Sequence, residues 1–190
     1  MPAAVAAMLL RDLAPEAAGA LAATRVASVA TVVERYPRAA LPAHLATTTG
    51  LRVPSSAGTL LKAATVLSAT WPHLANDDVL LRLSAGRAQG PDVTELLDAA
   101  LLDRLTADLA AVTGMTAHPS STLVHRWRGR RPSSRSVTSS APPLRAALAV
   151  HSGLLLAGAS YDGLGIAASA RSGERAAQAH LAAAIEAVGR

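Results

Sequence analysis

The sequence has 190 residues, of which 51% are hydrophobic and 16% charged, with a formal net charge of +5 and no cysteine. This length suffices for one domain with a hydrophobic core, or for two small lobes. The lack of cysteine excludes disulfides, cysteine-based zinc sites and thiol catalysis. The chain contains no uncharged apolar run of about 18 residues and no signal-peptide pattern, so we predict no membrane-spanning helix and a cytoplasmic location.

The positive charge is compatible with an anionic partner, but the aromatic content argues against nucleic acid. The chain has two Trp, two Tyr and no Phe, so few rings could stack on bases. We therefore predict no nucleic-acid partner. The histidines have no metal-like spacing, and without cysteine we predict no metal site. These histidines are His44, His73, His118, His125, His151 and His180.

The first half of the chain predicts two helices followed by strands. Residues 3–24 are Ala-rich with apolar residues at helical spacing, and Pro15 is expected to open a second helix. Alternating β-branched residues in VASVATVVER (26–35) predict a strand, and a long loop with two prolines follows. Further strands are predicted at 51–54, 59–68 and 79–87. Strands this close in sequence favour an antiparallel sheet.

From Asp92 the apolar period becomes helical, and residues 93–114 predict a helix that ends at Gly114. We expect a strand at 121–130, a polar proline-bounded loop at 131–143 and a short helix or turn at 144–153. Residues 154–160 predict a buried strand, and a long Ala-rich helix follows from about Ile166 to Val188. The fold class is therefore α+β: an antiparallel sheet with helices, closed by a C-terminal strand, turn and helix.

The stretch LAGASYDGLGIAASARSGERAA (156–177) combines that strand, a glycine turn and the helix. Gly158, Gly163 and Gly165 permit unusual φ angles, and a helix start offers unpaired N–H groups and a positive dipole end. Such a turn suits a phosphate or an electron-rich ring edge, but equally a plain tight turn between helix and sheet. The spacing is G-x4-G-x-G and not the dinucleotide pattern GxGxxG, so it leaves both interpretations open.

GLLLAGASYDGLGIAASARSGERAA resembles the C-terminal flavin motif of the protoporphyrinogen oxidase family. ASVATVVERYPRAAL, GLRVPSSAGTLLKAATVLSATWPHLA, VLLRLSAGR and LTADLAAVTGMTAHPSSTLVHRW resemble, in the same order, the second half of its bacterial members. The resemblance covers essentially the whole chain. It implies an FAD-dependent, flavin amine oxidase-like enzyme of haem biosynthesis, which oxidises protoporphyrinogen or coproporphyrinogen with oxygen as acceptor.

The resemblance also implies an organisation and a site. Residues 1–120 would form part of the substrate domain, and residues 121–190 the C-terminal part of the FAD-binding, Rossmann-like domain. The flavin ring would be met by the backbone of Ala159, Gly163, Leu164, Gly165 and Ile166, whereas the catalytic residues stay unknown. Family members often have Pro-Asp-Cys where this chain has 167–169, and residues 132–138 lack the aromatic, glycine and histidine that bacterial members tend to show.

The sequence contains no GxGxxG, so the N-terminal Rossmann segment that holds the FAD pyrophosphate is missing from it. We therefore interpret the chain as a C-terminal portion and expect it to bind FAD weakly or not at all by itself. The expected partners are a porphyrinogen and such a Rossmann segment, with peripheral membrane association left open. The alternatives are a non-catalytic remnant, a partner subunit, or a carotenoid desaturase-like flavoenzyme. The Arg-rich run 125–136 predicts a strand with alternate exposed arginines, although one arginine could pair with a porphyrin propionate.

Overall fold

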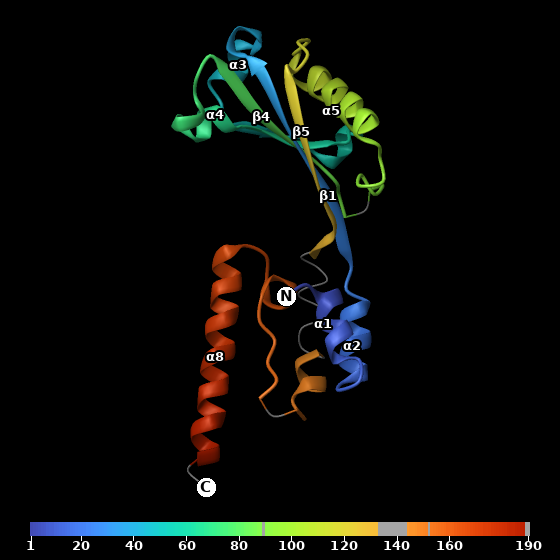
Figure 1. Ribbon diagram of the computed structural model, residues 1–190, viewed down its shortest axis with the longest axis vertical. Coiled ribbons are helices and arrows are strands. Elements are labelled where there is room, and N and C mark those ends of the chain that lie inside the picture. Colours follow the sequence, from blue (N-terminus) through green and yellow to red (C-terminus); the bar gives the residue numbers. More distant parts are fainter. Residues whose placement is uncertain (89, 133–143, 152, 189–190) are drawn as a thin grey trace. The chain divides into compact units, whose positions relative to one another are not determined.

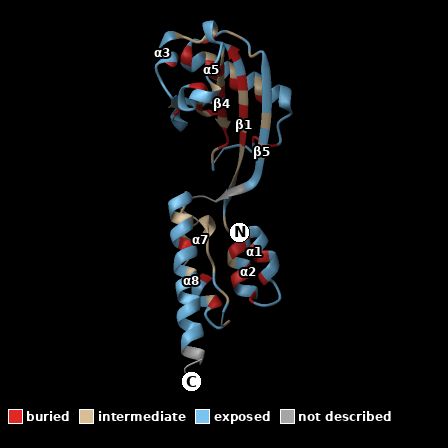
Figure 2. Cartoon of the chain, turned by 60° about the vertical axis from the view of Figure 1, so that its left-hand side comes forward, coloured by how far each residue is buried: buried red, intermediate tan, exposed pale blue. Residues whose placement is uncertain are grey.

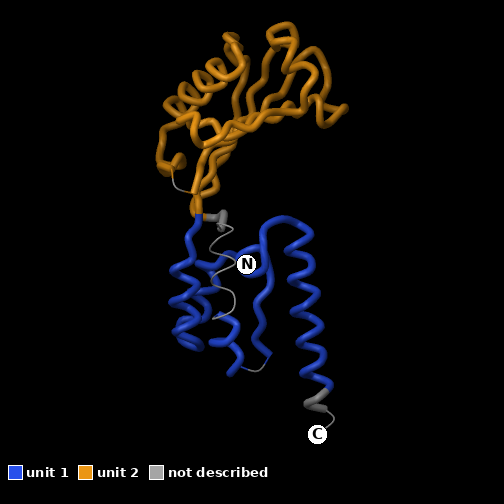
Figure 3. The backbone as a smooth tube through the Cα atoms, turned by 180° about the vertical axis from the view of Figure 1, so that it is seen from behind, with its two compact units in different colours: residues 1–26, 132–190 blue, residues 27–131 orange. Residues whose placement is uncertain are grey.

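A computed structural model describes residues 1–88, 90–132, 144–151 and 153–188. The chain forms two compact units, residues 27–131 and residues 1–26 with 132–190 (Figure 3). The described residues contain no helix that is both long and apolar enough to cross a membrane.

The unit of residues 27–131 is built on a five-stranded sheet with the order β2-β3-β4-β1-β5 (Figure 1). β1 pairs antiparallel with β4, β4 with β3, and β3 with β2. Along β1 and β5, the Ser120 N–H donates to the Arg35 carbonyl, and the Gly129 N–H reaches the Ser28 hydroxyl, so this pair is antiparallel too. The α+β class with an antiparallel sheet is thus confirmed. The strands are β1 (Val26–Pro37), β2 (Gly50–Arg52), β3 (Leu61–Val66), β4 (Asp78–Ala85) and β5 (Ser121–Pro132).

One face of this sheet is buried under α5 (Asp98–Thr113). Period-2 alternation places every second residue of β4, and of β1 from Ala30 onward, in the core. Leu101, Leu105 and Leu109 recur at helical spacing on α5 and join this core. Gly114 ends the helix in the left-handed conformation, with φ +72°, as its sequence position predicts. Short elements complete the unit: α3 (Ala43–Ala46), α4 (Leu67–Thr70), and the 3-10 helices η1 (Arg38–Ala40), η2 (Ser55–Ala57) and η3 (Pro72–Leu74).

The other unit has its own apolar core, formed mainly by small residues of α1 (Ala3–Leu10) and α2 (Pro15–Ala22). Pro15 occupies the first turn of α2, as predicted. Leu144 and Leu148, from a short helix at 144–148, and Tyr161, from α7 (Ala159–Asp162), complete the core. The long helix α8 (Ile166–Val188) has the bounds that the sequence predicts.

The predicted buried strand at 154–160 is wrong. Residues 154–157 have no regular secondary structure, and α7 begins at Ala159. A strand needs a neighbouring strand to pair its backbone groups, and the described strands belong to the other unit's sheet. Two other elements are shorter than predicted: the strand at 59–68 gives way to α4 at Leu67, and the helix at 93–114 begins only at Asp98.

The boundaries of the compact units lie after residues 26 and 131, whereas the sequence places a domain boundary after residue 120. β5 pairs with β1 and so stays with the sheet, while α1 and α2 pack with the C-terminal segments. The domain roles predicted for residues 1–120 and 121–190 stay predictions. The predicted loop 131–143 lies outside the described residues from 133 onward.

Candidate functional site

The predicted flavin-facing residues lie together where α7 turns into α8. Ala159 is the first residue of α7, Gly163 follows its last residue, and Ile166 is the first residue of α8. Gly163 has φ +127° and Gly165 has φ +103°, conformations that L side chains rarely adopt. The glycines are therefore required by the backbone path between two helices.

The turn is open to solvent. Leu164 is 39% exposed and Ile166 92% exposed, and a Cβ built on Gly165 would meet no atom within 4 Å. By helix geometry, the first N–H groups of α8 have no acceptor within the helix, and the first helical bond runs from the Ser169 N–H to the Gly165 carbonyl. The turn thus presents unpaired donors and a positive helix end.

A polar cluster that we did not predict lies beneath this turn. Ser172 in α8 accepts a hydrogen bond from the Gly158 N–H at 2.9 Å and donates its own proton to Asp162. The Asp162 carboxylate also accepts from Arg145 at 2.6 Å and forms an ion pair with Arg175 at 3.3 Å. We call these four side chains, Arg145, Asp162, Ser172 and Arg175, the clamp. The clamp joins both ends of α7 to the second turn of α8.

The charge state of Asp162 follows from these contacts. Its side chain is 8% exposed, and this burial by itself would raise the pKa of the carboxyl. The Ser172 hydroxyl and the guanidinium groups of Arg145 and Arg175 outweigh burial, and they hold the pKa below its ordinary value of 3.8. Asp162 is therefore an anion at neutral pH and neutralises part of the adjacent positive charge.

Tyr161 anchors the same segment to the core of its unit. It is 3% exposed, packs in the apolar cluster of α1 and α2, and its hydroxyl donates to the Met1 carbonyl at 3.4 Å. Burial raises the pKa of this phenol. Two neighbouring residues of α7 thus make different contacts: Tyr161 packs in the apolar core, and Asp162 bonds to α8.

The turn is compatible with the edge of a flavin ring. A flavin presents hydrogen-bond acceptors at its pyrimidine edge, and the exposed start of α8 offers N–H donors and a dipole that favours negative charge. The side chains of Ala159, Ala167 and Ala168 are small and leave the backbone accessible. Among the described residues the turn offers no cradle for a pyrophosphate, because its G-x4-G-x-G spacing is not that of the GxGxxG loop.

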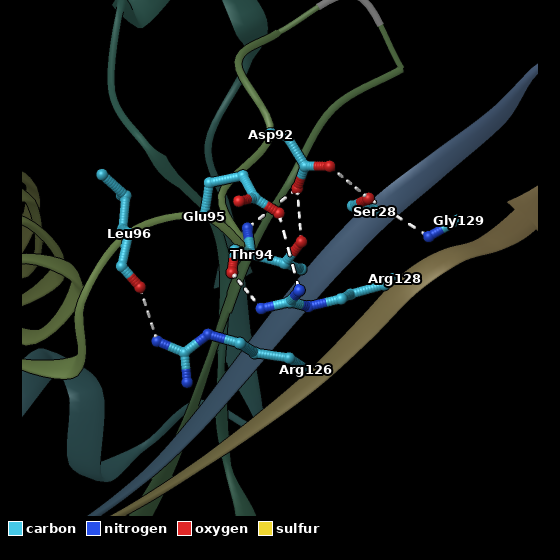
Figure 4. A network of polar contacts seen from close by, with 8 residues as sticks. All are labelled: Ser28, Asp92, Thr94, Glu95, Leu96, Arg126, Arg128 and Gly129. Atoms are coloured by element: carbon cyan, nitrogen blue, oxygen red, sulfur yellow. Dashed lines mark hydrogen bonds and ion pairs between the residues drawn. The ribbon is translucent and has the colours of Figure 1, made fainter.

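The Arg-rich strand has mainly a structural role (Figure 4). Arg126 pairs with Asp98 at 2.5 Å. Arg126 also donates to the Leu96 carbonyl, and Arg128 donates to the Thr94 carbonyl. These contacts hold the segment before α5 against β5. The predicted strand at 121–130 is confirmed, but the prediction that its arginines are exposed is wrong for Arg126, whose side chain is 20% exposed and pairs with Asp98.

Asp92 forms the second half of that network. It accepts from the Ser28 hydroxyl at 2.7 Å and from the Thr94 N–H and hydroxyl at 2.9 and 2.6 Å. The Thr94 hydroxyl lowers the pKa of Asp92 most, followed by that of Ser28. Since Ser28 also accepts from the Gly129 N–H, the network links β1, β5 and the segment before α5.

The sheet face opposite α5 carries cationic and aromatic side chains. Arg35 and Arg82 are exposed there, with Arg82 bonded to Thr65 at 3.3 Å and Arg35 at 3.7 Å from Asp78. On β5, Trp127 stands edge-on to His125 with the ring centroids 4.4 Å apart. Within the described ranges no three His, Asp or Glu side chains are grouped as a metal site would need.

Two curated relatives of the chain are coproporphyrinogen III oxidases. The chain is 31% identical over 180 residues to coproporphyrinogen III oxidase of Mycobacterium leprae, which covers 90% of this chain and 37% of that protein. It is 30% identical over 121 residues to coproporphyrinogen III oxidase of Bacillus subtilis, covering 62% of this chain and 26% of that protein. No protein-family model matches. The chain thus spans about a quarter to two-fifths of the curated relatives.

Two solved structures share its fold. The crystal structure of a "Putative protoporphyrinogen oxidase" from Exiguobacterium sp. 255-15 superposes with a TM-score of 0.75 and 24% identity, covering 95% of this chain and 40% of that one. Reduced UDP-galactopyranose mutase superposes with a TM-score of 0.50 and 15% identity over 68% of this chain and 28% of that one. At these identities the likeness concerns the fold alone.

Proposed function

Since the chain belongs to the protoporphyrinogen and coproporphyrinogen oxidase family, we propose that it takes part in the FAD-dependent oxidation of a porphyrinogen to a porphyrin in haem biosynthesis. The observation that carries this proposal is the solvent-open glycine turn at the start of α8, at the residues that the family resemblance assigns to the flavin. When bound, FAD would accept hydride from the substrate and pass electrons to oxygen.

The residues of the turn would bind and orient the ring. The backbone N–H groups of Ile166 and Ala167 are suited to donate to the ring's pyrimidine edge, and the α8 dipole would favour negative charge there. Gly163 and Gly165 keep the path free of side chains that would shield these donors. No acid or base from this chain is assigned to the reaction.

A porphyrinogen carries carboxylate side chains around an apolar macrocycle, so its receptor needs cations beside an apolar surface. The sheet face opposite α5 offers Arg35 and Arg82 as carboxylate partners and Trp127 as an aromatic surface. We assign the substrate carboxylates to this face in the proposal. Arg126 and Arg128 are poorer candidates because they face α5 and the segment before it, where Arg126 pairs with Asp98 and Arg128 donates to the Thr94 carbonyl.

The sequence has no GxGxxG, so the proposal requires another polypeptide segment to hold the FAD pyrophosphate. We expect the 190-residue chain alone to bind FAD weakly or not at all. A chain without GxGxxG could also be a partner subunit or a non-catalytic remnant. Flavin binding and activity together with such a segment distinguish these roles.

The test is reconstitution. The chain is purified alone and co-expressed with the part of the Mycobacterium leprae relative that it does not cover, and bound flavin is measured by absorbance. Coproporphyrinogen III and protoporphyrinogen are then supplied in air, and formation of the fluorescent porphyrin is followed. We expect little flavin with the chain alone, and flavin with porphyrin formation in the co-expressed sample.

A control co-expression replaces Gly163 and Gly165 by Ala in this chain, because both have positive φ and are expected to resist a Cβ. This variant should lose flavin while the chain stays folded. Stoichiometric FAD on the chain alone would overturn the expectation of weak binding. Flavin binding without porphyrin formation from either substrate would contradict the proposed reaction.

A further inference from the structure

The attachment of α8 depends on one buried side chain. Of residues 166–185, whose exposure the structure describes, Ser172 alone is buried, at 1%. Figure 2 shows the exposed colour along most of this helix. The larger apolar residues Leu181 and Ile185 are 60% and 72% exposed, so they contribute little packing. The position of α8 in its unit therefore depends mainly on polar contacts.

Those contacts all meet at the clamp. Ser172 binds the Gly158 N–H before α7 and the Asp162 carboxylate at the end of α7, so it closes a ring around the turn. Asp162 adds an ion pair to Arg175, one helical turn after Ser172. Among the contacts of the described residues, the turn between α7 and α8 has no other side-chain anchor, because Leu164 and Ile166 are exposed and the glycines have no side chains.

The clamp is itself fixed to the apolar core. Arg145 lies between Leu144 and Leu148, which are 2% and 3% exposed, on a helix packed into the core of α1 and α2. Tyr161 fixes α7 to the same core. The Asp162 carboxylate thus pairs with Arg145, on the helix packed into the core, and with Arg175 on α8, and so connects these two helices.

We propose that Asp162 is a positioning residue, which holds the glycine turn and the start of α8 in the geometry that meets the flavin. This inference rests on the proposed function for its flavin part. Asp162 acts through Ser172 and Arg175 and does not itself touch the ring. Loss of its charge removes the ion pairs to Arg145 and Arg175 and weakens the hydrogen bond from Ser172, which lets α8 move relative to α7.

The test compares Asp162→Asn with Glu174→Gln. Both variants remove one carboxylate charge with little change of shape, but Glu174 is exposed on α8 and forms no hydrogen bond or ion pair among the described residues. Arg145→Gln is the second variant, because Arg145 is 48% exposed at its side chain and its replacement leaves the core intact. Unfolding midpoints of all proteins establish that each is folded.

The first readout is amide hydrogen exchange of the chain without flavin. A hydrogen bond to a charged group contributes enough that its loss should raise the exchange rate at Gly158 and Ser169 about tenfold in Asp162→Asn. Arg145→Gln should give a smaller rise, and Glu174→Gln none. Unchanged exchange in Asp162→Asn would overturn the inference, whatever the flavin result.

The second readout uses the flavin-loaded assembly of the proposed function, with the FAD dissociation constant and the visible circular dichroism of the bound flavin. Asp162→Asn should weaken FAD about tenfold and change the spectrum at saturating FAD, while Glu174→Gln matches the wild type. If the wild type binds FAD and Asp162→Asn binds it equally with the same spectrum, the inference is refuted alone. If the wild type binds no FAD in any assembly, the proposed function fails, and with it the flavin role of Asp162.

Discussion

Glu34 carries a carboxyl group in the middle of an apolar core. A substitution of Tyr36, which bonds to it, tests how much this hydrogen bond contributes to the stability of the sheet unit. Both side chains are 0% exposed and lie on the α5 side of β1. The Tyr36 hydroxyl donates to Glu34 at 2.7 Å, and the Thr106 hydroxyl on α5 donates to the other carboxylate oxygen at 3.5 Å. Tyr36→Phe removes the shorter of these bonds and keeps the ring.

The expected loss follows from leaving a buried acceptor without its donor, about 1–3 kcal/mol. For a small unit whose unfolding free energy changes by about 1–3 kcal/mol per molar urea, the midpoint should fall by about 1 M. Trp71 and Trp127 both lie in the unit of residues 27–131, so tryptophan fluorescence during urea unfolding reports on this unit.

The loss should also depend on pH. Burial raises the pKa of Glu34 above its ordinary value of 4.5, against the opposing effect of the Tyr36 and Thr106 hydroxyls. A carboxyl with a raised pKa in the folded state contributes stability below pH 4.5, and that stability is lost as the pH rises through the raised pKa. The ionised form needs the Tyr36 donor most, so the Tyr36→Phe defect should grow with pH.

Glu34→Gln supplies the matched control, because an amide oxygen can still accept from Tyr36 and does not titrate. We expect this variant to be at least as stable as the wild type at neutral pH, and Tyr36→Phe in its background to show no pH dependence. An equal defect of Tyr36→Phe at acidic and neutral pH, or a large loss of stability in Glu34→Gln, would refute this reasoning.

Two further predictions concern backbone positions. Gly86→Ala should destabilise the sheet unit by more than about 1 kcal/mol, because a Cβ there would lie 2.3 Å from the Ser28 carbonyl oxygen and φ is +101°. Gly19→Ala, inside α2, should instead stabilise the protein by about 0.5–1 kcal/mol, because its Cβ would meet no atom within 4 Å. Thermal unfolding of both variants checks these opposite signs. Asp92→Ala should speed amide exchange at Thr94, whose N–H it accepts at 2.9 Å, with little change in the urea midpoint because the carboxylate is solvated, and an unchanged exchange rate at Thr94 would contradict this.

Much of the sheet unit could be predicted from local patterns. Alternation of β-branched and apolar residues indicates the strands, and helical spacing of leucines indicates α5. The order of the strands could not be predicted this way, because β5 pairs with β1 although 83 residues (38–120) separate the two strands. Glu34 did leave a signal: it occupies the inward register of β1 with Ala30, Val32 and Tyr36, where a charge must find a buried partner.

The second unit was harder for a physical reason. Residues 154–160 form a short apolar run, which by itself does not distinguish a strand from other buried structure. The glycine positions indicate the turn correctly, because positive φ is a local requirement. The clamp could not be predicted in the same way, since its partners are 10 and 17 residues apart and meet only when α7 folds against α8.

The two long helices are held by different forces, and this bears on what each can do. Leu101, Leu105 and Leu109 bury α5 on the sheet, and such apolar burial involves no group that titrates with pH. α8 is held by Ser172 and by charges around Asp162, contacts that depend on exact donor and acceptor positions and on the ionised carboxylate. A helix attached in this way transmits a change at its start to the clamp, and a change at the clamp to its start. Such coupling is reciprocal, so a ligand that fixes the start of α8 would in turn stabilise the clamp.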